Sequence, residues 1–158
     1  MTAGTRWQFV GFIVVLVAAH FFLRVGLGLG LWAPDLLVVA LLLVSRRVRP
    51  GTAAGIGVLL GLLEGAATPP LFGPSSLALV VLGYLGSRSR EVLAGDDPLN
   101  LVAFLFVGTM CYQVLLYLIL AVQGQGGSAV ALLVPAILGG LYAAAAGLGA
   151  VSLYRTVA

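Results

Sequence analysis

The sequence predicts an all-α fold, a polytopic bundle of about six transmembrane helices that forms a single integral membrane domain over residues 1–158. Hydrophobic residues make up 61% of the chain and charged residues only 8%, whereas soluble domains carry about 25% charged residues. Apolar runs follow one another along almost the whole chain, and clusters of Arg, Pro and Gly separate them. Such clusters are typical of turns between helices.

The breaks between apolar runs define the expected helices. A spanning helix needs about 20 apolar residues, and the second and fourth runs are the shortest. We therefore keep four or five spans with one re-entrant segment as the alternative. The expected helices cover residues 7–23, 31–45, 51–67, 74–87, 99–122 and 129–153.

Residues that favour helix starts occur at the beginning of three of these runs. Pro34 fits a first helical turn, where its missing N–H breaks no hydrogen bond, and Asp35 suits the positive end of the helix dipole. Ser75 is expected to cap the fourth helix, and Asp96 or Asp97 the fifth. The first run follows an Arg, as in a signal peptide, but further apolar runs come after it. We therefore interpret it as an uncleaved transmembrane helix.

The distribution of Arg predicts the orientation. All eight basic residues are Arg, and seven of them fall on one side of a six-helix bundle, which is expected to be cytoplasmic. Both termini then lie in the cytoplasm, and Arg24 is the exception on the outer side. The seven are Arg6, Arg46, Arg47, Arg49, Arg88, Arg90 and Arg155.

Four polar residues are expected to meet at the outer end of the bundle. A charge inside a span costs about 2.5–3.5 kcal/mol on insertion scales. Asp35 begins the second helix and Glu64 lies near the end of the third, while His20 and Arg24 share a face of the first. We predict a structural or partner-binding cluster in which Arg24 pairs with Asp35 or Glu64. Alternatively, Asp35 is solvated and Arg24 extends to the lipid headgroups.

Small residues at four-residue spacing form faces on two helices. Gly57, Gly61 and Gly65 share one side of the third helix, and Gly140 and Ala144 share one side of the sixth. Such faces let membrane helices approach closely. They are expected to be helix-packing faces, and internal packing is commoner than the alternative, partner binding.

No catalytic, metal or cofactor site is expected from the sequence. The single His20 and single Cys111 cannot build a usual zinc site, and Cys111 is interpreted as a small apolar packing residue. No HExxH, Lys-containing phosphate loop or GxSxG motif occurs. The net charge of +3 is spread over helix ends, so nucleic-acid binding is not expected. We therefore expect a protein that is not an enzyme.

Residues 32–88 carry an ordered set of motifs. A Pro-Asp-Leu start at 34–36 precedes an apolar run and a basic turn; a Gly-rich helix then ends in Glu64 and Gly65. A Pro/Gly turn and a helix closing in Gly-Tyr-Leu-Gly-Ser-Arg at 83–88 follow. This order resembles the rod shape-determining protein MreD family over about a third of the chain. The family usually has Asp at the position of Glu64.

The resemblance implies a subunit of the bacterial rod complex, or elongasome, in the inner membrane. It implies binding to MreC, indirect links to MreB, RodA and a class B penicillin-binding protein, and a role in cell shape and lateral peptidoglycan synthesis. It also implies a fold similar to the substrate-binding (S) subunits of energy-coupling-factor transporters. The helix of MreC would pack on Gly57 and Gly61, with Glu64 and Asp35 fixing its register. Whether the chain also forms a homodimer stays open.

The alternative function is a small-molecule, vitamin-like binding subunit of a membrane transporter. Its pocket would open outward and would be lined by His20, Arg24, Glu64, Thr109 and Gln113. Thr109 and Gln113 belong to a polar stripe on the fifth helix that either lines a cavity or bonds to a neighbouring helix. The short outer loops speak against a pocket, because loops usually supply ligand contacts and lids.

Overall fold

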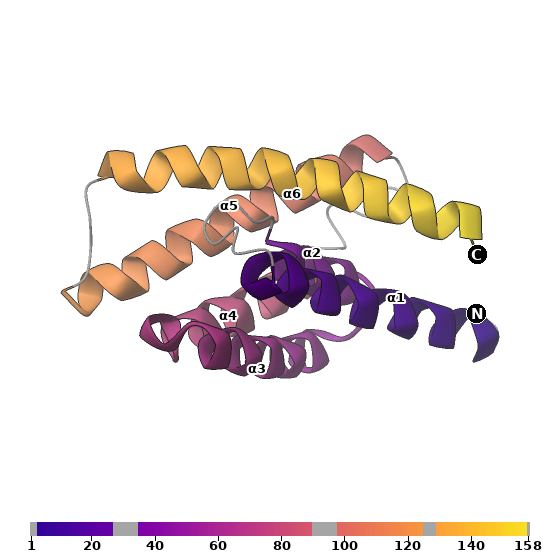
Figure 1. The fold of residues 1–158 in the computed structure, drawn as a ribbon, viewed down its shortest axis with the longest axis horizontal. Helices are drawn as coiled ribbons and strands as arrows, with labels where there is room; N and C mark the ends of the chain where they lie inside the picture. The colour runs from indigo at the N-terminus through magenta and orange to yellow at the C-terminus, as the bar shows by residue number, and fades with distance from the viewer. Residues whose placement is uncertain (1–2, 27–34, 90–97, 125–128, 158) are drawn as a thin grey trace.

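The computed structural model describes residues 3–26, 35–89, 98–124 and 129–157, and within them the chain forms six α-helices and no strand (Figure 1). The expected all-α class and helix count are confirmed. A π-helical turn, η1 (Phe22–Gly26), extends α1, and a short 3-10 turn, η3 (Pro69–Leu71), precedes α4. The α-helices are α1 Ala3–Phe21, α2 Leu36–Ser45, α3 Pro50–Ala67, α4 Pro74–Ser89, α5 Pro98–Val122 and α6 Ala129–Val157.

Three described segments are long and apolar enough to cross a membrane, namely Trp7–Arg24, Pro50–Ala67 and Leu99–Val122. Two described apolar helices are shorter, Leu36–Ser45 and Ile137–Gly149. At 1.5 Å per residue, the 10 residues of α2 extend about 15 Å, which is half of a hydrocarbon layer about 30 Å thick. Residues 31–34 of the second expected helix, with Pro34, lie outside the described part of the chain, as do Asp96 and Asp97.

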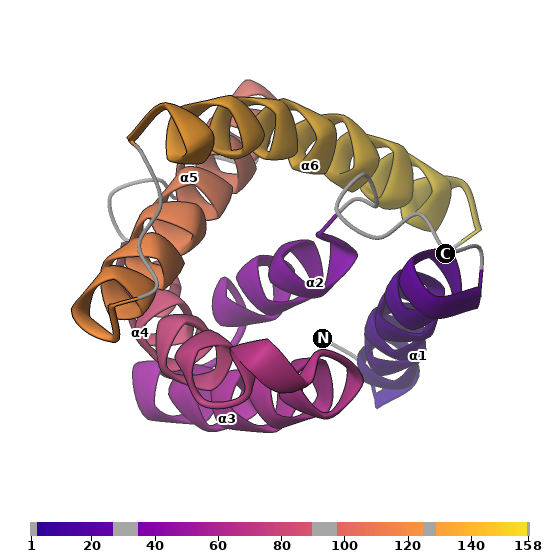
Figure 2. The same ribbon diagram turned by 60° about the vertical axis from the view of Figure 1, so that its left-hand side comes forward.

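The short helix α2 forms the centre of the molecule. All ten of its residues are buried, and it contacts α1, α3, α4, α5 and α6. Figure 2 shows the other five helices arranged around it. The sequence of α2, LLVVALLLVS, is apolar on every side, and a helix of this kind is surrounded on every side by other helices or by lipid.

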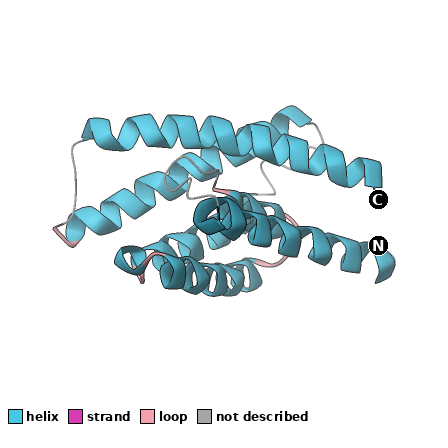
Figure 3. Cartoon of the chain, in the orientation of Figure 1, coloured by secondary structure: helices cyan, strands magenta, loops and turns pink. Residues whose placement is uncertain are grey.

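Successive helices run in alternating directions through the molecule. In the turn after α2, the Arg47 guanidinium lies 3.8 Å from the centre of the Phe9 ring on α1, and Arg46 lies 5.6 Å from that of Phe104 on α5. Ser87, near the end of α4, donates a 2.7 Å hydrogen bond to the Val48 carbonyl. The starts of α1, α3 and α5 therefore meet the ends of α2 and α4. Both chain termini also lie at one end of the molecule (Figures 1 and 3).

The expected cap at Ser75 is wrong. Its hydroxyl donates to the Leu71 carbonyl at 2.8 Å instead of accepting a backbone N–H. The reason is its position: α4 begins at Pro74, so Ser75 lies inside the helix, where a serine hydroxyl bonds back to the carbonyl four residues earlier. Asp35 occupies the N-cap position of α2, but its side chain makes no capping hydrogen bond.

Candidate functional site

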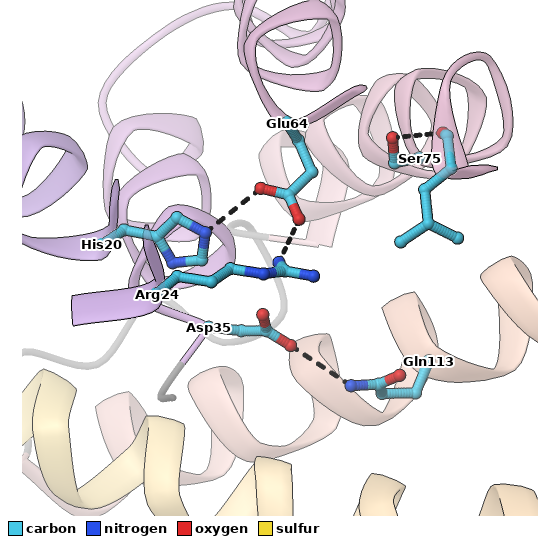
Figure 4. Close-up of polar contacts among 7 residues, drawn as sticks. His20, Arg24, Asp35, Glu64, Ser75 and Gln113 are labelled. Atoms are coloured by element: carbon cyan, nitrogen blue, oxygen red, sulfur yellow. Dashed lines mark hydrogen bonds and ion pairs between the residues drawn. The ribbon is translucent and has the colours of Figure 1, made fainter. Parts of the chain in front are cut away.

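The centre of the candidate site is Glu64, in the last turn of α3. The residue is 3% exposed, and both carboxylate oxygens are used (Figure 4). His20 Nε2 lies 3.1 Å from Oε2, and Arg24 Nη1 donates to Oε1. One carboxylate thus accepts from two side chains of the α1–η1 segment and fixes that segment against α3. Of the two expected partners of Arg24, the structure selects Glu64.

The local structure of α1 and η1 brings His20 and Arg24 to the same carboxylate. His20 lies in the last turn of α1, and Arg24 lies four residues later in the π-helical turn, so the two side chains extend from one side of the segment. Single π-helical turns are frequent at functional sites. The edge of the His20 ring packs on Phe21, with centroids 5.3 Å apart, and only 1% of His20 is exposed.

Asp35, at the N-cap of α2, belongs to the same site and connects it to α5. Its Oδ2 accepts a hydrogen bond from Gln113 Nε2 on α5 at 3.2 Å, and Figure 4 shows its carboxylate beside the Arg24 guanidinium. Asp35 is half-buried at the start of α2 and is bonded to Gln113, so solvent is not its only partner. Of the two roles considered for the polar stripe, Gln113 has the second, a hydrogen bond to a neighbouring helix. Sequence reasoning did not identify Asp35 as its partner.

The site lies at the ends of α1, α2 and α3 that are opposite the Arg-rich turn, as expected, and beside the middle of α5. Gln113 precedes Val122, the last residue of α5, by nine residues, which is about 13 Å along the helix axis. The helix α5 therefore extends beyond the start of α2, where Asp35 lies. Tyr112, which is 5% exposed, lies within electrostatic range of Asp35 and Glu64. Sequence reasoning missed Tyr112, because an aromatic residue in an apolar helix carries no distinguishing signal.

The small-residue faces pack inside the chain. A Cβ added to Gly57 would lie 2.5 Å from the Leu79 carbonyl oxygen of α4, and one on Gly61 would collide with Ser76. Gly65 faces Phe72 in the same way. In this conformation α4 already covers Gly57 and Gly61. A partner helix therefore cannot pack on this face, contrary to the expectation for MreC.

The corresponding face of α6 is also occupied. A Cβ on Gly140 would lie 3.0 Å from the Phe106 ring of α5, and Ala144 is buried. Six of the described glycines have nothing within 4 Å of the position of an added Cβ. Among them are Gly11, Gly51, Gly55 and Gly149.

Comparisons with known proteins do not place the chain in a family. No protein-family model, curated protein or solved structure matches it. The resemblance of residues 32–88 to the MreD family therefore stays a prediction from the order of the motifs in the sequence.

The geometry favours a structural or electrostatic role for the cluster. The ion pairs join α1 to α3, and the Asp35–Gln113 bond joins the start of α2 to α5. Thr109, part of the pocket considered above, instead donates to the Leu105 carbonyl of its own helix at 2.8 Å. Among the described residues, no group of three or more His, Cys, Asp and Glu side chains is placed to hold a metal ion.

Proposed function

We propose that the chain is a non-enzymatic, multi-pass subunit of the bacterial rod complex in the inner membrane, and that it binds MreC directly. The observation that carries this proposal is the motif order over residues 32–88. The three long apolar helices support a membrane location. The Arg-rich turn at 46–49 and the shared end of the termini support cytoplasmic termini by the positive-inside rule. MreB, RodA and a class B penicillin-binding protein would be reached through MreC.

The outer face of α3 is the docking surface that we propose for the MreC helix. Gly51 and Gly55 are exposed and four residues apart, with open space at both Cβ positions. Val58 and Leu62 continue this face and are also exposed. A small pair followed by apolar side chains allows the backbones of two membrane helices to approach closely. This surface replaces the Gly57–Gly61 face, which α4 covers.

Co-purification from membranes tests the proposal. Wild-type chain carrying an affinity tag should retain MreC, and Gly55→Leu should retain about tenfold less, a loss of about 1.4 kcal/mol. Gly149→Leu is the matched control, because Gly149 also has nothing within 4 Å but lies on α6. If the wild-type chain fails to retain MreC, the function is wrong. If the wild type binds and Gly55→Leu binds equally well, only the docking surface is wrong.

The geometry supports a vitamin-like binding subunit less well. His20 and Arg24 bond to Glu64, Gln113 bonds to Asp35, and Thr109 bonds within α5. A ligand would have to break these contacts before it could use the same groups. Thermal stabilisation of the purified chain by a vitamin would favour this function over the scaffold.

A further inference from the structure

The end of the molecule opposite the polar cluster around Glu64 carries exposed Arg side chains that no acid of the described residues neutralises. Arg47, Arg49 and Arg88 are all exposed there. Both acids that the structure describes belong to the polar cluster at the other end. The sequence of residues 91–97 contains three more acids, and the seven Arg expected on this side outnumber them. This end of the molecule is therefore positively charged.

Close packing brings two of these Arg residues together. Ser87 donates its 2.7 Å hydrogen bond to the Val48 carbonyl, and Arg88 and Arg49 are the residues that directly follow these two in the chain. A Cβ added to Gly86 would lie 2.8 Å from the hydroxyl oxygen of the last residue of α2. The end of α4 is thus packed tightly against the turn between α2 and α3, and this junction holds Arg49 and Arg88 near each other.

Arg47 adds positive charge on the other side of the same turn. Its guanidinium lies 3.8 Å from the centre of the Phe9 ring. The face of an aromatic ring attracts the cation, but the N–H donors in the guanidinium plane stay available for an anion. The helix α3 also begins here, and its N-cap, Arg49, makes no capping hydrogen bond with its side chain. The positive end of the helix dipole therefore adds to the charge of the Arg residues.

The outer face of α4 next to Arg88 has the order of groups that a phospholipid requires. Tyr84 precedes Arg88 by four residues and shares its face of the helix, and 50% of Tyr84 is exposed. Leu77, two turns further from Arg88 on the same face, is 56% exposed. Tyr side chains favour the level of the lipid headgroups. Leu77, Tyr84 and Arg88 therefore match, in this order, the acyl chains, the interface and the headgroup of a lipid.

We propose that Arg49 and Arg88 form a binding site for the phosphate of an anionic phospholipid in the cytoplasmic leaflet, with the acyl chains along the outer face of α4. The planar N–H donors of Arg match the oxygens of a phosphate group, and an anionic headgroup supplies the negative charge that the described residues lack at this end. A soluble anion would meet the same donors but would gain nothing from the apolar face of α4. The proposal rests on the membrane location in the proposed function and not on the binding of MreC.

A lipid site differs from the general effect of positive charge on orientation. The positive-inside rule counts each Arg near the membrane alike, whereas a site depends on particular Arg residues. Arg155, near the end of α6, provides the comparison. It is expected on the same side of the membrane, but its helix does not belong to the junction of α4 with the turn between α2 and α3. Arg155→Gln is therefore the matched control for Arg49→Gln and Arg88→Gln.

Native mass spectrometry of protein released from nanodiscs tests the proposal. The nanodiscs contain phosphatidylcholine, which has no net charge, mixed with anionic phosphatidylglycerol, and the lipids that stay bound are counted. The wild-type protein should retain phosphatidylglycerol in preference. Arg49→Gln and Arg88→Gln should each lower this retention about fivefold, the effect of one basic residue at a membrane surface, and Arg155→Gln should not. Because both Arg side chains are exposed, the variants should unfold at the wild-type temperature in phosphatidylcholine alone.

Four outcomes would contradict the lipid site. They are equal retention of the two lipids by the wild type, an equal loss in all three variants, release of the bound lipid by inorganic phosphate, and wild-type retention in both site variants. If one site variant fails to fold, the other still gives the comparison with Arg155→Gln. A chain that does not enter nanodiscs would contradict the membrane location itself, and with it the proposed function. Loss of the lipid preference alone would leave that function intact.

Discussion

At the scale of the residue, Glu64 connects two helices because both of its oxygens have donors. A carboxylate buried in an apolar bundle is stable only when positive groups or hydrogen bonds replace its hydration. His20 and Arg24 provide both in this structure. Removing one partner of a buried pair costs about 3–5 kcal/mol, because the other charge stays buried without compensation.

Charge reversal at Arg24 tests the pairing. Arg24→Glu should strongly destabilise the protein or prevent its insertion, since it places three acids in one buried cluster. Adding Glu64→Arg should restore part of the stability, because the exchanged pair regains opposite charges. Adding Asp35→Arg instead should restore less, because Asp35 accepts its hydrogen bond from Gln113. Thermal unfolding in detergent measures all three, and equal recovery in both double variants would contradict the assigned partner.

Two polar residues of α5 should respond differently to apolar substitution. Gln113→Leu leaves Asp35 without its donor and should cost about 1–3 kcal/mol, the penalty for an unsatisfied buried group. Thr109→Val should cost less, because Thr109 bonds only to the Leu105 carbonyl of its own helix, which adds little to helix stability. Unfolding midpoints of the two variants give the comparison. A larger loss for Thr109→Val would contradict the role of Gln113.

At the scale of the element, α3 has two glycine faces with opposite surroundings. One face holds Gly57 and Gly61 directly against the backbone of α4, and Gly83 of α4 approaches Ala53 of α3 in return. The other face carries Gly51 and Gly55 in open space. The same spacing of small residues therefore serves internal packing on one side of the helix and leaves a surface on the other.

Alanine substitutions on these two faces should have opposite signs. Gly55→Ala should stabilise α3 by up to about 1 kcal/mol through helix propensity, because the new methyl group meets nothing. Gly61→Ala should destabilise the protein by about 1–3 kcal/mol, because its Cβ collides with Ser76 and forces α3 away from α4. Thermal unfolding of the purified variants measures the difference. Stabilisation by both substitutions would show that α3 and α4 are less closely packed.

At the scale of the whole molecule, α2 determines the arrangement. Because α2 is surrounded by the other helices, the polar cluster at its start is enclosed between the ends of α1 and α3 and the middle of α5. The basic turn at its other end contacts α1 and α5 through Arg47 and Arg46. The molecule is therefore polarised, with an Arg-rich end and a buried polar centre.

Cysteine labelling in intact cells should locate the two ends. In a Cys111→Ala background, a cysteine replacing exposed Arg47 should react only with reagents that enter the cytoplasm. A cysteine replacing exposed Gln123, at the opposite end of α5, should react with reagents that do not enter. Val122→Cys is a second probe of that end. Labelling of the Arg47 position from outside would reverse the proposed orientation.

Much of the fold was predictable because backbone groups in an apolar environment must satisfy one another within a helix. The runs of apolar residues and their breaks therefore located all six helices to within a few residues. The place of α2 was less predictable. Its uniformly apolar sequence suits either lipid or protein neighbours, and only the packing of the other helices decides between them.

By itself, the sequence determined the helical class and singled out His20, Arg24, Asp35 and Glu64 as costly groups that need partners. The tertiary structure decided which partners they have. Arg24 bonds to Glu64 rather than Asp35, and Asp35 bonds to Gln113, which is 78 residues away in the chain. The tertiary structure also decided that α4 covers the face of α3 that contains Gly57. Periodicity defines what a helix face contains, but the neighbour of that face depends on contacts between segments distant in sequence.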